Sequence, residues 1–111
     1  MELLTKLEEL ILLSVWRLGK DAYGTAIYRH IQSVTEKRLS LGGVYFPLDR
    51  LAKKGYLRVY NASGGQDRKG MIRRSYELTE TGLEALNDVR RVNEIMWAGF
   101  PGFAVSCGDS R

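Results

Sequence analysis

The chain has 111 residues, of which 44% are hydrophobic and 27% charged, as in one ordinary globular domain. It contains no run of about 18 apolar residues, and its acidic N-terminus does not look like a signal peptide, so we expect a cytoplasmic protein without a membrane partner. One histidine, one cysteine and the lack of metal-ligand spacing or a phosphate loop argue against an enzyme, a metal site or a cofactor.

Basic residues concentrate in the middle of the chain. From Arg17 to Arg74 there are 13 lysines and arginines against 4 acidic residues, a balance of +9, whereas the two ends together carry −5. The net charge of +4 hides this asymmetry. A basic centre between acidic ends predicts a localised anionic partner.

A capping box opens the first predicted helix. The hydroxyl of Thr5 and the carboxylate of Glu8 stand three residues apart, so each can satisfy a free backbone N–H group at a helix start. Apolar residues then recur at helical spacing until Gly19. We therefore predict a core helix over residues 6–18.

A second helix is predicted over residues 22–35, with Asp21 as its N-cap. Its apolar face consists of Ile27, Ile31 and Val34. The polar segment that follows connects this helix to a glycine-rich stretch. Two helices and a short polar link before a third helix make a helix-turn-helix arrangement.

The third predicted helix has an apolar back and a basic, aromatic front. Its apolar face consists of Val44, Leu48, Leu51 and Ala52, and its opposite face of Tyr45, Asp49, Arg50 and Lys53. Because proline is tolerated in the first turn of a helix, Pro47 places the start at Gly43 or Val44, and Gly55 marks the end. Such a helix suits a DNA major groove; the alternative is an ordinary amphipathic surface helix.

Two alternating segments predict a β-hairpin after the third helix. They span residues 56–60 and 73–78, and the loop between them contains three glycines and the basic residues Arg68 and Lys69. A hairpin with a basic tip after three helices is a winged helix, in which Arg68, Lys69 and Arg73 would approach a phosphate backbone or the minor groove. The alternative is a solvated surface loop.

Thr79 is expected to cap a last helix over residues 80–98. Its main apolar stripe consists of Ala85, Val89, Val92 and Met96. Ile95 and Trp97 add apolar surface beside this stripe, more than a terminal helix needs for packing on a small domain. We expect the stripe to form a homodimer interface; the alternative is a helix that folds back on its own core.

The predicted fold class is mainly α with a small β-hairpin: a winged helix-turn-helix domain over residues 1–78, a dimerisation helix over residues 79–98 and a tail over residues 99–111. The predicted function is a sequence-specific, DNA-binding transcriptional regulator with double-stranded DNA as its partner. Its groove-facing residues would be Tyr45, Asp49, Arg50 and Lys53, and its backbone contacts Lys37, Arg38, Ser40, Gly42 and Lys54. The alternative is a winged-helix ligand-sensing or protein-docking module without DNA binding.

The chain resembles the PadR family of transcriptional regulators over about residues 7–98. The resemblance is carried by Tyr23-Gly24, Ile27, Leu39-Ser40-Leu41-Gly42, Val44-Tyr45, Leu48, Arg50-Leu51, Lys54-Gly55-Tyr56-Leu57, Arg73-Arg74, Tyr76 and Leu78-Thr79-Glu80-Thr81-Gly82. Two positions depart from the family's pattern. Phe46 stands between the tyrosine and the proline that usually follows it directly, and Gly43 stands where a threonine is frequent.

This resemblance implies a homodimeric winged-helix regulator, usually a repressor, that binds a palindromic site. The single helix after the hairpin is similar to that of the smaller subfamily, in which this helix supplies the dimer contact. Some small members respond to flat aromatic ligands at the dimer interface, with a tryptophan on the last helix. Trp97 is the matching candidate for binding an aromatic effector; the alternative is that it only packs the dimer.

Overall fold

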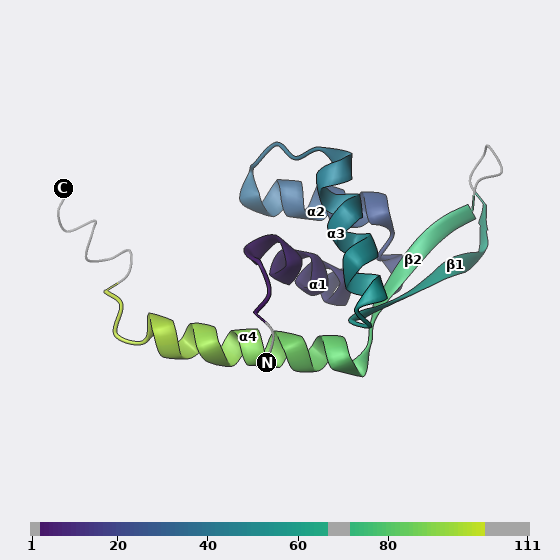
Figure 1. The fold of residues 1–111 in the computed structure, drawn as a ribbon. Coiled ribbons are helices and arrows are strands. Elements are labelled where there is room, and N and C mark those ends of the chain that lie inside the picture. Colours follow the sequence, from purple (N-terminus) through teal and green to yellow (C-terminus); the bar gives the residue numbers. More distant parts are fainter. Residues whose placement is uncertain (1–2, 67–71, 102–111) are drawn as a thin grey trace.

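The computed structural model describes residues 3–66 and 72–101, with residues 61–66 and 72–73 described by their backbone alone. Along the chain lie α1 (Lys6–Leu18), the 3₁₀ turn η1 (Gly19–Asp21), α2 (Gly24–Thr35), α3 (Leu41–Lys53), β1 (Leu57–Gln66), β2 (Ile72–Leu78) and α4 (Glu80–Trp97). Figure 1 shows α1, α2 and α3 gathered into one body, with the hairpin on one side and α4 running past α1 and beyond the body. The predicted class, mainly α with a small hairpin, is confirmed.

The start of α1 confirms the predicted capping box. The N–H of Glu8 donates to Oγ1 of Thr5 at 3.1 Å, and the N–H of Thr5 donates to Oε1 of Glu8 at 2.8 Å. Only 5% of the surface of Glu8 is exposed, so its carboxylate lies between the helix start and the body of the domain.

The second helix starts later than its sequence suggests. α2 begins at Gly24, and Asp21 belongs to the η1 turn instead of capping the helix. A tertiary contact delays the start of the helix, because the carbonyl of Ala22 accepts a hydrogen bond of 3.0 Å from the N–H of Tyr76 in β2. Tyr23 also forms a bridge with the hairpin, so the segment before Gly24 is extended along β2 and cannot be helical.

The start of α3 also differs from the prediction. The helix begins at Leu41, because Oγ of Ser40 accepts a hydrogen bond of 3.0 Å from the N–H of Gly43 and caps the first turn. Pro47 therefore lies inside the helix, where it removes the donor that would pair with the carbonyl of Gly43. Its ring is buried, and the cap and the buried face together outweigh one missing helical bond.

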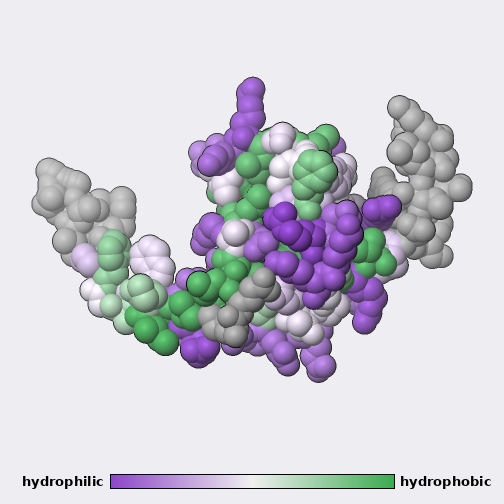
Figure 2. All heavy atoms as spheres, viewed as in Figure 1, coloured by the Kyte–Doolittle hydropathy of each residue, from purple (hydrophilic) through white to green (hydrophobic). Residues whose placement is uncertain are grey.

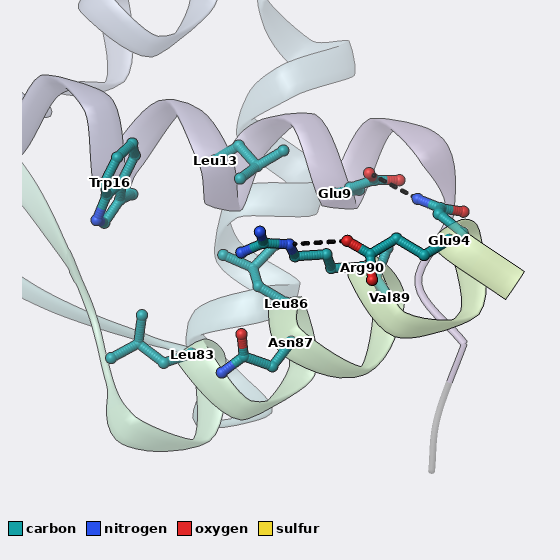
Figure 3. Close-up of a pocket in the computed structure, with 10 residues that line it drawn as sticks. Glu9, Leu13, Trp16, Leu83, Leu86, Asn87, Val89, Arg90 and Glu94 are labelled. Carbon is teal, nitrogen blue, oxygen red and sulfur yellow. Dashed lines mark hydrogen bonds and ion pairs between the residues drawn. The ribbon is translucent and has the colours of Figure 1, made fainter. Parts of the chain in front are cut away.

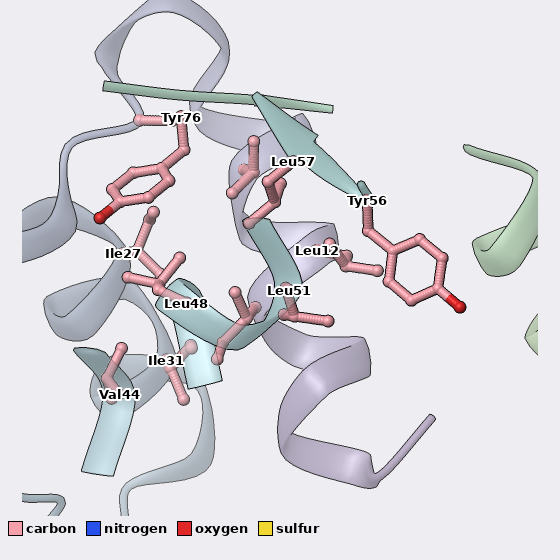
Figure 4. Close-up of a cluster of buried hydrophobic side chains, with 12 residues drawn as sticks. Leu12, Ile27, Ile31, Val44, Leu48, Leu51, Tyr56, Leu57 and Tyr76 are labelled. Atoms are coloured by element: carbon pink, nitrogen blue, oxygen red, sulfur yellow. The ribbon is translucent and has the colours of Figure 1, made fainter. Parts of the chain in front are cut away.

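The core lies where α1, α2 and α3 meet the base of the hairpin (Figure 4). Its buried side chains are Ile11, Leu12, Val15, Ala22, Ile27, Ile31, Val44, Leu48, Leu51, Tyr56, Leu57 and Tyr76. Val34, expected on the same face as Ile31, is instead 60% exposed, since it lies in the last turn of α2, past the edge of the core. In the hairpin, Leu57 pairs with Leu78, and β1 continues past the predicted end at residue 60.

Thr79 caps α4, as predicted. Its Oγ1 accepts a hydrogen bond of 3.0 Å from the N–H of Gly82, and its hydroxyl donates to the carbonyl of Gly55 at 2.6 Å. The first half of α4 packs along α1, and Ala85 and Leu86 reach the core, whereas the second half extends beyond the body (Figure 1). In the part of the chain that the structure describes, no helix is long and apolar enough to cross a membrane.

Candidate nucleic-acid interface

The link between α2 and α3 is held by side chains of α2. The hydroxyl of Tyr28 donates to the carbonyl of Leu39 at 2.8 Å, and the N–H of Leu39 donates to Oε1 of Gln32 at 3.2 Å. Glu36 ends α2 in the left-handed conformation, with a φ of 55°. These contacts set the direction of α3 relative to α2, as a DNA-reading pair of helices requires.

The outer face of α3 points to solvent. It carries Gly42, Phe46, Asp49 and Lys53, which recur at helical spacing opposite the buried side chains of this helix. Nζ of Lys53 lies 3.9 Å from Oδ2 of Asp49, with 80% and 58% of these two side chains exposed. An exposed pair of this kind contributes little stability, so Lys53 can leave Asp49 for a base edge or a phosphate, and Asp49 can then accept from a base amino group.

Tyr45, predicted to face the groove, is half-buried between α3 and α2. Its ring packs against Gly24, where an added methyl group would overlap the ring. Gly24 therefore lets the two helices approach, and the larger part of the Tyr45 side chain serves to seat α3 on α2.

Arg50, also predicted to face the groove, is directed towards α1. Its Nη2 lies 3.6 Å from Oε2 of the buried Glu8, while 53% of the Arg50 side chain remains exposed. Since Glu8 also completes the cap of α1, this pair joins the start of α1 to the second half of α3. Arg50 thus lies at the edge of the outer face, partly committed to holding α3 in place.

The residues predicted to contact the DNA backbone flank α3 at its two ends. Lys37, Arg38 and Ser40 are exposed in the link before the helix, and Lys54 is exposed directly after it. The hydroxyl of Ser40 already serves as the cap of α3. In Figure 2, hydrophilic side chains gather over the part of the body where Figure 1 places α3.

The hairpin lies beside this surface. Arg74 on β2 is exposed, and Nη1 of Arg58 pairs with Oε1 of Glu77 across the strands at 2.8 Å. The predicted wing residue Arg73 lies in β2, but its side chain is outside the described part of the structure, and Arg68 and Lys69 lie outside the described residues altogether. Contact between these three residues and DNA therefore stays a prediction.

Tyr76 joins the hairpin to α3 electrostatically. Burial raises the pKa of its hydroxyl, and the charge of Arg74 opposes this shift, while Tyr45 and Asp49 on α3 add to it. The net effect is a raised pKa, so the hydroxyl stays protonated and able to donate at neutral pH. The base of the hairpin and the outer face of α3 thus share a polar junction.

A groove of about 480 Å³ lies between α1 and α4 (Figure 3). Its apolar wall consists of Leu13, Trp16, Leu83, Leu86 and Val89. Nδ2 of Asn93 donates to Oε2 of Glu9 at 3.4 Å, which ties α4 to α1 at one end of the groove. Trp16 is 60% exposed, so this groove has an open aromatic side chain in its wall.

The predicted dimer stripe divides into two parts along α4. Its half-buried members are Ala85, Val89 and Val92, and its exposed member is Met96, at 76%. The residues around Met96 that are also exposed are Ile95, Trp97 and Phe100, at 63%, 62% and 61%. The rings of Trp97 and Phe100 meet edge to face, with centroids 5.1 Å apart. The uncovered apolar surface thus lies at the end of α4, and Trp97 is part of it.

Phe46 is the residue of the outer face that the sequence pattern leaves unassigned. It is 75% exposed and stands midway between Gly42 and Asp49 on α3. A helix start at Gly43 or Val44 makes Phe46 a first-turn residue beside a proline. Helical spacing counted from Gly42 would have placed it on the same line as Asp49 and Lys53.

Comparisons with known proteins match both the sequence and the fold. The sequence model of the family described as "Transcriptional regulator PadR-like family" matches residues 12–88. RosR of H. salinarum is 26% identical, with a TM-score of 0.65 over 86% of this chain and 79% of that chain. A PadR family transcription regulator from Clostridium difficile is 24% identical, with a TM-score of 0.62 over 88% of this chain and 100% of that chain. Among curated proteins, no relative matches.

A PadR-like transcriptional regulator from Bacillus cereus shares the same fold. It is 22% identical to this chain, with a TM-score of 0.65 over 81% of this chain and 82% of that chain. Each of these alignments covers most of both chains.

Proposed function

The chain belongs to the PadR-like family of transcriptional regulators, and on this premise we propose that it is a homodimeric repressor that binds a palindromic DNA operator through α3 of each protomer. The members of this family regulate transcription through DNA and are not enzymes. A dimer with two-fold symmetry favours a palindrome, because each protomer then meets the same half-site.

The proposal rests mainly on the exposed polar side chains of the outer face of α3. Asp49 can accept a hydrogen bond from a cytosine amino group, and Lys53 can donate to a guanine or a phosphate. Both are exposed, and Gly42 in the first turn of the helix has no side chain of its own on this face. Tyr45 and Arg50 support the helix from its two edges.

The contacts with the DNA backbone would come from the two ends of α3 and from the hairpin. The proposed residues are Lys37, Arg38, Ser40, Gly42 and Lys54 around the helix, and Arg68, Lys69 and Arg73 in the hairpin. The N–H groups of the first turn of α3 favour an anion at the same place, because the positive end of the helix dipole lies there.

The proposed homodimer is supported by the apolar end of α4. Ile95, Met96, Trp97 and Phe100 expose most of their surface, and α4 extends past the body of its own domain. Such a patch on a projecting helix suits the same patch on a second copy, since a two-fold interface pairs identical surfaces.

A small aromatic effector is a second, subordinate part of the proposal. The groove between α1 and α4 supports it, because the groove has an aromatic side chain in its wall and room for a flat ring. Trp16 lines this groove, while Trp97 lies on the proposed dimer surface, so Trp16 is the better candidate for direct contact with an effector.

A mobility-shift assay with the DNA upstream of the protein's own gene tests DNA binding. We expect a shift that weakens steeply with salt, with a log–log slope of about −0.9 for each phosphate neutralised and about 6–10 such contacts. Lys53→Ala should weaken binding by about fivefold or more, the lower limit for loss of one specific base contact.

Arg91→Ala on α4 is the matched control for this test. Arg91 is 59% exposed and lies 3.6 Å from Asp88 on its own helix, much as Lys53 pairs with Asp49. Its removal deletes the same charge away from α3 and should leave binding unchanged. Equal losses in both variants would mean that only overall charge matters, and no shift at low salt would favour the alternative of a docking or sensing module without DNA binding.

A further inference from the structure

We propose that Phe46 reads thymine methyl groups in the major groove and so sets part of the operator sequence. This inference rests on the proposed DNA binding by α3 and adds a base specificity to it. It concerns an exposed apolar side chain at the centre of a face that otherwise carries Gly42, Asp49 and Lys53.

Phe46 lies exposed on the outer face of α3, with its ring directed towards the helix start. It is 75% exposed, whereas Val44, Leu48 and Leu51 of the same helix are buried in the body of the domain. A Cβ built on Gly42 would lie 3.6 Å from Cε2 of Phe46, so the ring lies back along the helix over Gly42. Helical side chains lean towards the helix start in this way. The ring thus covers the outer side of the first turn, the part of a reading helix that contacts base edges.

The side chains of the first half of α3 also point to Phe46 as the residue that contacts bases. Leu41, Gly42 and Gly43 present no side-chain donor or acceptor, and Tyr45 is half-buried against Gly24. The polar groups of the outer face, Asp49 and Lys53, both lie in the second half of the helix. Leu41, the other exposed apolar side chain of the first half, is 49% exposed and lies about 100° around the helix from Gly42, so Phe46 is the side chain of the outer face there that can discriminate between bases. The C5 methyl of thymine is the apolar group that a major groove offers to such a side chain.

The test removes the methyl group from the DNA. Bound sequences are first selected from a random pool with the wild-type protein, and each thymine of the selected site is then replaced singly by deoxyuridine, which keeps the base pair and lacks the methyl. For wild type, we expect one or two replacements in each half-site to raise the Kd by about fourfold, the equivalent of about 0.8 kcal/mol for one buried methyl-sized group.

The variants decide whether Phe46 is responsible. Phe46→Ala should lose this fourfold discrimination, Phe46→Leu should keep most of it, and Lys53→Ala should bind more weakly overall yet retain it. Leucine and alanine are good helix formers, and position 46 is exposed, so both variants should fold as wild type does.

The experiment distinguishes a failure of the proposed DNA binding from a failure of the proposed role of Phe46. If the selection recovers no site and no DNA is bound at low salt, the proposed function fails together with this inference. If a site is bound but deoxyuridine has no effect, or has the same effect on wild type and Phe46→Ala, DNA binding stands and the role of Phe46 is refuted.

Discussion

Single residues in this protein connect segments that lie far apart in the chain. Glu8 caps α1 and also pairs with Arg50 on α3. Gly82, in the first turn of α4, also packs against a distant segment, because a methyl group added there would overlap the backbone carbonyl of Tyr56. The N–H of Thr79 donates to the same carbonyl at 3.1 Å, so the start of α4 is tied to the start of the hairpin by backbone atoms that cannot move aside cheaply.

We expect Gly82→Ala to lower the free energy of unfolding by about 1–3 kcal/mol, the usual cost of overpacking. Gly42→Ala is the control, since it also lies in the first turn of a helix and the new methyl group would meet Phe46 at an ordinary 3.6 Å. This control should be neutral or slightly stabilising, because alanine is the better helix former. Urea unfolding measures both variants, and equal stability in the two would refute the proposed role of the Tyr56 carbonyl.

Helix α4 shows two different environments along one element. Its first half is held by the cap at Thr79 and by packing on α1, whereas its second half leaves the body and exposes Met96 and its neighbours. Packing on the protein's own core is thus seen for the first half of the helix, whereas the dimer contact stays a proposal that rests on the exposed second half. The second half is therefore the part of α4 that we propose as the interface between two copies.

Met96→Glu should convert the proposed homodimer into a monomer at micromolar concentration. Burial of an unpaired carboxylate costs more than the roughly 1–3 kcal/mol of a neutral polar group, so we expect the dimer dissociation constant to rise by about tenfold or more. Because Met96 touches little of its own domain, the melting temperature of the monomeric domain should change little.

Val34→Glu is the control, because it places the same charge on an apolar residue of α2 that is 60% exposed. Analytical ultracentrifugation over a range of concentrations measures both variants. If Met96→Glu associates as wild type does, or if Val34→Glu dissociates to the same extent, the end of α4 is not the dimer interface.

At the scale of the whole molecule, α1 contacts both α3, the proposed DNA-reading helix, and the groove proposed for an effector. Two consecutive residues make the connection: Glu8 pairs with Arg50 on α3, and Glu9 accepts a hydrogen bond from Asn93 on α4. A ligand that spreads α1 and α4 would therefore act on the helix start that also supports α3. Such coupling is reciprocal, so DNA should weaken binding of any ligand that weakens DNA binding.

Tryptophan fluorescence tests this site, with quinoline and 2-naphthoate as probes. In Trp97→Phe the remaining signal comes from Trp16, and we expect saturable quenching and a weaker DNA complex in the presence of the probe that binds. In Trp16→Phe the signal comes from Trp97, and quenching should be lost or much reduced. Quenching in Trp16→Phe alone would move the site to the end of α4, and no quenching in either variant would leave both tryptophans as packing residues.

Local features of the sequence were sufficient for the order and type of the elements. The capping box at Thr5 and the cap at Thr79 were both predicted, because a helix start depends on residues three or four positions apart. Alternation likewise predicted the base of the hairpin. The starts of α2 and α3 were placed wrongly, because the first depends on the bond from Tyr76 to Ala22 and the second on a cap strong enough to tolerate Pro47.

The sequence by itself therefore determined the winged-helix class, the basic middle of the chain and the apolar excess of its last helix, since periodicity, caps and composition are local. Only the tertiary structure decided which side chains reach the outer face of α3. Tyr45 is drawn inwards by the space above Gly24, and Arg50 is drawn aside by Glu8, which leaves Phe46 exposed between Gly42 and Asp49. The physical reason is that the placements of Tyr45 and Arg50 each depend on a contact with a residue more than twenty positions away in the chain.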